Sequence, residues 1–480
     1  MSEAMKAPTQ LLVDGAWVDG SEGTFDVLDP STGSPIAAVA RAGTRDMSAA
    51  IDAAAAAQPA WAATAPRERS EVLRRAYDLL VDRAEDMARL MSLEMGKALG
   101  DSRDEVLYAA DFLRWYSEEA VRVGGELRMS PTGQNRIITF EKPSGVALLL
   151  TPWNFPAAMA TRKLGPALAA GCSVVLKPAE DTPLTALTLA RILIEAGVPD
   201  GVLNVVTTEQ PGPIVEHALG DERVRKLSFT GSTRVGTLLL KQAADRVVSS
   251  SMELGGNNAF IVCADADLDA AIDGAMIAKM RNGGQACTAA NRFLVDESLA
   301  PEFAHRLAER MGALKMGPGT EPGTQLGAMI NARQRAGVAD RVARSVEAGA
   351  KAILGGFVPE GPGYFYPATV LTDVPRESAV ATEEIFGPVA PIIATTSDED
   401  AIALANSSTL GLTGFVYTRD LARGLRICER LEVGMVGLNR GLVSDPAAPF
   451  GGVKHSGLGR EGGFEGIEEY LETTYVAGSW

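Results

Sequence analysis

Short apolar strands alternate with helical stretches through the middle of this 480-residue chain, and this pattern limits the folds open to it. Strands are expected at 145–150, 173–176, 203–206 and 226–229, with helices between them. A second alternation begins at 258–263. Strands that alternate with helices form a parallel sheet covered on both faces, so the sequence predicts an α/β fold.

Local signals refine this expectation at three places. Asp181, Thr182 and Pro183 resemble the capped start of a helix. Residues 126–142 alternate as strands do and are expected to form a protruding ribbon. The last apolar stretch, 472–476, resembles an edge strand, which needs cover from another element or subunit.

Composition excludes several classes of function. A net charge of −16 disfavours nucleic acid and anionic membrane as partners. No uncharged apolar run is long enough to span a membrane, and residues 1–10 lack a secretory signal pattern. The four cysteines show no CxxC spacing, which favours a reducing cytoplasm. The three histidines are scattered, so no metal is expected.

One cysteine lies in a context suited to covalent catalysis. Gly283 and Gly284 precede Cys287, so the backbone can approach a substrate closely and leave the sulfur accessible. An isolated cysteine is more often a small core residue, but this glycine-rich context favours a nucleophile. Glu253 lies in a second glycine-rich turn, and a thiol with a carboxylate base forms a covalent-catalysis pair.

Other polar groups follow expected strands, where α/β sheets bind ligands. Lys177 and Glu180 could hold ribose hydroxyls, or form an ordinary charge pair. The turn at Gly231 and Ser232 opens a helix whose free N–H groups can hold a pyrophosphate, although it is no G-x-G-x-x-G fingerprint. Asn154 lies in a turn made rigid by flanking prolines, which suits an oxyanion donor or a turn that bonds its own backbone.

A carboxylate and an aromatic ring lie two residues apart near the end of the chain. Glu384 and Phe386 would share one face of an extended segment. The carboxylate suits ribose hydroxyls and the ring suits a flat heterocycle, whereas an exposed Glu beside a core Phe is the ordinary alternative.

Taken together, these segments resemble the NAD(P)-dependent aldehyde dehydrogenase superfamily over nearly the whole chain. Within it the sequence is most similar to succinate-semialdehyde dehydrogenases. The segments that support this are 153–156 with 161–163, Arg281-Asn282, and 449–462.

The resemblance implies an α/β, aldehyde dehydrogenase-like fold with two doubly wound parallel-sheet domains and a small bridging β-ribbon for oligomerisation. The expected division is a dinucleotide-binding domain at 1–125 and 143–254, a catalytic domain at 255–445, and an oligomerisation ribbon at 126–142 and 466–480. A dimer or tetramer in the cytoplasm is expected.

The resemblance also implies roles for individual residues. Cys287 would attack the aldehyde, Asn154 and the Cys287 N–H would stabilise the oxyanion, and Glu253 would activate water to hydrolyse a thioester. A carboxylate at Glu180 would repel a 2′-phosphate, so NAD is expected rather than NADP. The expected cofactor-binding residues are Thr151, Trp153, Lys177, Glu180, Gly212, Gly231, Ser232, Leu254, Glu384 and Phe386.

The expected substrate is succinate semialdehyde. Arg162 and Arg281 match positions where cations hold the distal carboxylate, and Ser444 would supply a hydroxyl. Asp445 departs from the commonest pattern and would disfavour an anion near the pocket. Glutarate or 2-oxoglutarate semialdehyde therefore stay open as substrates. A CoA-acylating aldehyde dehydrogenase is another alternative, which Glu253 as a water-activating base disfavours.

Overall fold

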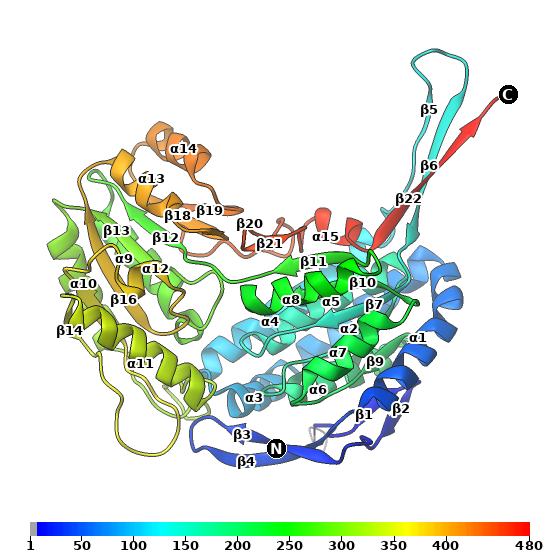
Figure 1. Ribbon diagram of the computed structural model, residues 1–480, viewed down its shortest axis with the longest axis horizontal. Helices are drawn as coiled ribbons and strands as arrows, with labels where there is room; N and C mark the ends of the chain where they lie inside the picture. The colour runs from blue at the N-terminus through cyan, green and yellow to red at the C-terminus, as the bar shows by residue number, and fades with distance from the viewer. Residues whose placement is uncertain (1–6) are drawn as a thin grey trace.

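The chain is described over residues 7–480 by a computed structural model. The first six residues lie outside the described part, so the expectation about a secretory signal is not addressed there. Two open sheets lie side by side, and a long β-ribbon projects away from the first of them (Figure 1). The segment that carries β20 (Val453–Lys454), β21 (Gly457–Leu458) and α15 (Glu465–Glu468) crosses between the two sheets.

The first sheet has eight strands and is parallel at its centre. Every residue of its two central strands, 146–150 and 173–177, is buried, as expected for strands covered on both faces. The strands at the two borders of the sheet, β1, β2 and β21, pair antiparallel. The parallel sheet expected from the sequence did not include them. In spatial order the strands are β2 (Ala16–Val18), β1 (Leu11–Val13), β9 (Leu203–Val205), β8 (Ser173–Lys177), β7 (Val146–Leu150), β10 (Val224–Thr230), β11 (Ser249–Glu253) and β21.

Helices cover both faces of this sheet. Helices α1 to α6 share one apolar core that includes alternate side chains of β7 and β8. On the opposite face, α7 and α8 pack with α1. α5 is buried along its whole length, because it lies between the sheet and α4. The helices are α1 (Thr44–Ala63), α2 (Pro66–Asp82), α3 (Ala84–Met95), α4 (Leu99–Glu119), α5 (Pro156–Ala170), α6 (Pro183–Glu195), α7 (Pro211–Gly220) and α8 (Thr233–Ala244).

The order of strands reverses between β7 and β10. From β7 the chain moves outward through β8 and β9, and it then returns to form β10 and β11 on the other side. Open α/β sheets bind ligands at such a switch point, outside the carboxyl ends of the strands. The turns after Leu150 and Thr230 are therefore the place where a ligand should lie.

The second sheet has seven strands and is parallel except for its border strand β14. Its order is β14 (Lys351–Leu354), β15 (Thr369–Thr372), β16 (Val389–Thr395), β13 (Arg292–Asp296), β12 (Ala259–Val262), β18 (Thr413–Tyr417) and β19 (Met435–Leu438). One face packs against α9 (Leu268–Met280) and α10 (Ala300–Gly312). The other packs against α11 (Ala332–Glu347), α12 (Ala379–Thr382), α13 (Asp398–Asn406) and α14 (Leu421–Arg430).

Three smaller β-structures complete the chain. β3 (Thr24–Asp29) pairs with β4 (Ser34–Ala40), and β17 (Leu410–Gly411) pairs with β20. The projecting ribbon consists of β5 (Leu127–Met129), β6 (Arg136–Pro143) and β22 (Leu471–Gly478). β22 pairs with β6 along one edge, which confirms the expected terminal strand.

The α/β fold class is confirmed, and one local expectation is wrong. α6 does begin at Pro183, but Thr182 makes no side-chain cap. Glu94 of α3 caps the helix instead, because its carboxylate accepts the Leu184 and Thr185 N–H groups at 2.7 and 2.8 Å. A cap that comes from another helix has no local sequence signature.

Candidate active site

The carboxyl edge of the first sheet brings two expected residues to one place. β7 ends at Leu150 and leads into the turn that holds Asn154, and α5 then starts at Pro156, where a proline needs no N–H partner. β11 ends at Glu253, two strands away in the sheet. These side chains therefore meet at the carboxyl edge of the first sheet.

The cysteine comes from the amino edge of the second sheet. A short 3₁₀ turn, η2 (Arg281–Gly284), precedes Cys287, which lies before β13. Asn282, Gly283 and Gly284 all have positive φ, at 53°, 59° and 74°. A Cβ on Gly284 would lie 2.2 Å from the Gly387 oxygen, so only glycine fits there.

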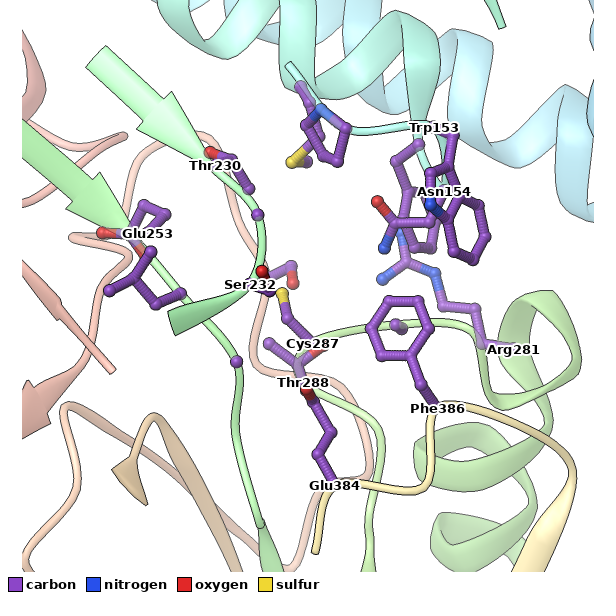
Figure 2. Close-up of a pocket in the computed structure, with 18 of the residues that line it drawn as sticks. Trp153, Asn154, Thr230, Ser232, Glu253, Arg281, Cys287, Thr288, Glu384 and Phe386 are labelled. Carbon is purple, nitrogen blue, oxygen red and sulfur yellow. The ribbon is translucent and has the colours of Figure 1, made fainter. Parts of the chain in front are cut away.

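Both edges line one cavity. Figure 2 shows Cys287 near its middle, with Glu253 on one side and Asn154, Trp153 and Phe386 on the other. The remaining expected residues in the cavity wall are Arg162, Gly231, Ser232, Leu254, Arg281, Glu384 and Ser444. A site shared by two sheets explains why its residues are spread through the chain.

The Cys287 thiol is not activated by its surroundings alone. Burial raises the pKa of Cys287 to about 12, and the carboxylates of Glu253 and Glu384 raise it further. Arg162 and the Thr288 N–H act in the opposite direction. The thiol therefore keeps its proton at neutral pH in this arrangement and requires a base to become a nucleophile.

Glu253 is a buried carboxyl group without a hydrogen bond. It is 2% exposed, and neither oxygen has a partner within residues 7–480. Burial, followed by the charge of Glu461, raises the pKa of Glu253 well above its usual range. A carboxyl group in this state can take and release a proton near neutral pH, as a general base must.

Glu461 is also buried, but its pKa is shifted in the opposite direction. Its Oε2 lies 2.6 Å from Arg162 Nε, and its Oε1 pairs with Lys163. These two cations hold the pKa of Glu461 below its usual range against the effect of burial. The pKa values of two neighbouring buried carboxyl groups thus shift in opposite directions, which suits Glu253 to carry a proton and Glu461 to stay charged.

Asn154 is held by its backbone as well as by its amide. Its Nδ2 donates to the Gln285 carbonyl oxygen at 3.1 Å, next to the cysteine segment. Its own carbonyl oxygen accepts Lys97 Nζ at 2.7 Å and Asn282 Nδ2 at 2.8 Å. One hydrogen of the amide is left for another acceptor, as an oxyanion donor requires.

The expected cofactor residues form two groups. Trp153 and Phe386 meet edge to face with centroids 5.4 Å apart, and Glu384 Oε1 accepts the Gly256 N–H at 2.9 Å. Burial raises the pKa of Glu384 to about 7. Four expected residues lie outside the cavity wall and follow the same sheet edge outward, namely Thr151, Lys177, Glu180 and Gly212.

The sheet edge fits a dinucleotide. Ser232 caps α8 through its hydroxyl, which accepts the Val235 N–H at 3.4 Å, while Gly231 adds no side chain in front of this helix start. The N–H groups at a helix start suit a pyrophosphate. Thr230 presents a buried hydroxyl without a hydrogen-bond partner among the described residues. Lys177 Nζ lies 3.5 Å from Glu180 Oε2.

The three expected substrate residues gather in one part of the cavity but differ in their partners. Arg281 forms no ion pair within residues 7–480, and its guanidinium lies over the Phe155 ring at 4.7 Å. Arg162 lines the cavity too, but its Nε is engaged by Glu461 and its guanidinium lies 3.9 Å from the Phe450 ring centroid. Asp445, by contrast, is exposed and accepts the Ala447 N–H at 2.9 Å, outside the cavity wall.

Sequence reasoning missed Tyr108, Lys163 and Glu461. Lys163 and Glu461 lie in segments that supported the family resemblance, but nothing in their spacing shows that they pair. Tyr108 lies in the middle of α4, where aromatic residues are commonly core. Within residues 7–480 no helix is long and apolar enough to cross a membrane, and no cluster of His, Cys, Asp and Glu could hold a metal.

Comparisons with known proteins agree with this arrangement. The aldehyde dehydrogenase family model matches residues 17–476. The chain is 56% identical to a succinate-semialdehyde dehydrogenase of Paenarthrobacter nicotinovorans, over 92% of this chain and 98% of that protein. It is 46% identical to a glutarate-semialdehyde dehydrogenase of Pseudomonas putida, with 99% of each covered. A solved succinate-semialdehyde dehydrogenase from Burkholderia pseudomallei superposes with a TM-score of 0.98 at 44% identity, over 100% of both chains.

The match extends over nearly the whole length of the chain, and the expected cysteine, carboxylate and amide meet in one cavity. This protein is therefore an enzyme of the aldehyde dehydrogenase family.

Proposed function

We propose that the protein oxidises succinate semialdehyde to succinate with NAD. The observation that supports this most is Arg281, a cation without an ion pair in the described chain, on the wall of the cavity that holds Cys287. The chain as a whole carries a net charge of −16, which repels anions. A positive pole in such a protein is a specific adaptation to an anionic substrate.

The chain's own residues supply the covalent chemistry. Glu253 takes the thiol proton, and the Cys287 sulfur attacks the aldehyde carbon. The Asn154 amide and the Cys287 N–H donate to the oxygen that becomes negative. When bound, the nicotinamide cofactor supplies the hydride acceptor, and a thioester on Cys287 results. After it has released the thiol proton to solvent, Glu253 takes a proton from water, whose oxygen attacks the thioester. The carboxylic acid product is released as the C–S bond breaks and Cys287 leaves as the thiolate.

The residues that follow the sheet edge support NAD over NADP. Glu180 follows β8 and has only a weak ion pair with Lys177, at 3.5 Å. Its carboxylate accepts hydrogen bonds from ribose hydroxyls but repels a 2′-phosphate. We expect kcat/KM to be higher with NAD than with NADP. Equal or better kcat/KM with NADP would overturn this preference.

An activity assay also tests the alternative semialdehyde substrates and CoA as an alternative acyl acceptor. Glutarate or 2-oxoglutarate semialdehyde would use the same cationic pole, and a CoA-acylating enzyme would require CoA for turnover. An unpartnered carboxyl group at Glu253 supports hydrolysis by water. We expect full turnover without CoA and the highest kcat/KM on the C4 semialdehyde in a panel read at the absorbance of the reduced cofactor.

Arg281→Ala is the sharpest test of the substrate. Loss of a charged hydrogen bond of about 1.5–3 kcal/mol should raise KM for succinate semialdehyde by about tenfold or more, with KM for butanal almost unchanged. Arg103→Ala removes a surface arginine of α4 that pairs with Glu85, so it serves as the control. An equal rise in KM for both aldehydes would reject the role of Arg281 in binding the substrate carboxylate.

We further propose that the ribbon joins two copies of the chain. β22 leaves one edge without a strand partner in the described chain and exposes Tyr475 and Val476. The proposed division into a dinucleotide-binding part (residues 1–125 and 143–254) and a catalytic part (residues 255–445) is supported by the two sheets, although β21 returns from beyond both ranges to the first sheet. The cytoplasmic location stays a prediction.

A further inference from the structure

Tyr108 presents a hydroxyl group to the part of the cavity that holds the arginines. It lies on α4 and lines the cavity together with Arg162, Arg281 and Ser444. Its ring packs edge to face on Phe112, with centroids 4.9 Å apart, so the side chain is fixed in direction. No other role is available to this hydroxyl in the proposed reaction, because Cys287, Glu253 and Asn154 account for the covalent steps.

The Tyr108 hydroxyl is buried and makes no hydrogen bond of standard geometry within residues 7–480, although Ser444 and Arg162 lie close enough to lower its pKa by weak hydrogen bonding. A buried polar group without a partner costs free energy, so such groups in native proteins call for an explanation. A ligand with an acceptor atom at this point removes the cost. The unpartnered hydroxyl is therefore a second sign, besides the unpaired Arg281, that something polar binds here.

The neighbouring groups define the chemistry of that ligand. Burial raises the pKa of Tyr108, so its hydroxyl keeps its proton and can act as a donor. Arg162 and Arg281 are positively charged, and Ser444 adds a second hydroxyl. Four groups that can all donate surround one point, and a carboxylate, which accepts on two oxygens, matches this set.

We propose that Tyr108 is a specificity-determining residue, whose hydroxyl donates a hydrogen bond to the distal carboxylate of the substrate beside Arg281. This inference rests on the proposed semialdehyde dehydrogenase function and adds a neutral donor to its cationic pole. The Tyr108 ring has a separate task, since the Arg281 guanidinium lies 5.6 Å from its centroid and packs on it.

The change Tyr108→Phe separates the hydroxyl from the ring. We expect KM for succinate semialdehyde to rise about tenfold, the effect of one lost hydrogen bond to a charged group, while kcat and KM for butanal stay as in the wild type. Inhibition of butanal oxidation by succinate should weaken by the same factor. Tyr108→Leu removes the ring as well and should raise KM further, because Arg281 loses its support.

Tyr116→Phe is the matched control. Tyr116 lies on the same helix, is fully buried and also has a hydroxyl without a hydrogen bond of standard geometry in the described chain, where it faces the Gly462 backbone, but it does not line the cavity. Loss of the Tyr116 hydroxyl should leave KM for succinate semialdehyde and KM for butanal unchanged. Thermal unfolding of each variant, together with NAD binding, shows that the protein is folded.

Two failures can be told apart. If the wild-type enzyme prefers the semialdehyde but Tyr108→Phe changes neither its KM nor the succinate inhibition, or changes KM equally for butanal, the role of Tyr108 is rejected and the proposed function stands. If the wild-type enzyme oxidises butanal as efficiently as the semialdehyde, the proposed function itself is rejected, and the inference falls with it.

Discussion

At the scale of single residues, the chemistry depends on how burial and neighbouring charges shift the pKa values of Cys287 and Glu253 in the cavity and of Glu461 behind it. Burial raises the pKa of Cys287 to about 12 and that of Glu253 well above its usual range, whereas Arg162 and Lys163 hold that of Glu461 low. The charge of Glu253 contributes to the raised pKa of the thiol. Glu461 supplies a fixed negative charge behind them.

The raised pKa of the thiol predicts how it reacts in the cofactor-free protein. Only the thiolate is alkylated, and below a pKa of about 12 its fraction rises tenfold with each pH unit. We expect the iodoacetamide reaction rate of Cys287 to rise about tenfold per unit between pH 7 and pH 9. Cys287→Ala gives the background from the other three cysteines. A plateau near pH 8 would show a lower pKa and contradict the prediction.

At the scale of elements, a buried ion pair joins the segment between α3 and α4, the helix α4 and the start of α5. Lys97 and Glu105 are fully buried and form a salt bridge. Glu105 Oε1 accepts the Ala157 and Ala158 N–H groups at 2.9 and 3.2 Å, where a carboxylate also complements the helix dipole. Lys97 Nζ reaches the Asn154 carbonyl oxygen at 2.7 Å, so the pair holds the amide donor in place.

Removal of one partner of this pair should affect stability and rate together. Lys97→Met leaves Glu105 buried and unpaired, which costs about 3–5 kcal/mol of the free energy of unfolding. We expect a lower thermal midpoint and a reduced kcat, because the turn of Asn154 loses a donor. Arg103→Met, which breaks the surface pair between Arg103 of α4 and Glu85 of α3, should leave the thermal midpoint and kcat almost unchanged. Equal effects of Lys97→Met and Arg103→Met would refute the role of Lys97 in positioning Asn154.

The elements themselves were largely predictable, because their periodicity is local. The expected strand at 145–150 is β7, and the helix expected between it and the strand at 173–176 is α5. The Glu94 cap of α6 and the antiparallel border strand β21 were not predictable. Both arise from segments far apart in the sequence, where no local pattern marks the contact.

At the scale of the whole molecule, the site exists only because the carboxyl edge of one sheet faces the amino edge of another. Glu253 ends β11 in the first sheet, and Cys287 precedes β13 in the second. The ribbon of β5, β6 and β22 extends away from both sheets (Figure 1). Its exposed edge has no function inside one chain, which is the basis for the proposed self-association.

Truncation of the chain tests that proposal. Removal of residues 471–480 takes away β22 and so its pairing with eight residues of β6, and we expect a particle of monomer mass by light scattering. Removal of residues 479–480 alone leaves β22 intact and should keep the mass of the full chain. The same mass for both truncated proteins would show that the ribbon does not hold copies together.

The sequence by itself determined which residues could react. A cysteine after two glycines, a carboxylate at a strand end and an amide between two prolines are local patterns, and the fold class followed from the alternation of strands and helices. Only the tertiary structure decided their charges and partners. Lys163 and Glu461 lie 298 positions apart in the chain and meet in the core, and the Arg281 guanidinium lies over the ring of Tyr108, which comes from the distant helix α4. Burial and long-range pairing set pKa values and free donors, and neither is encoded in any short stretch of sequence.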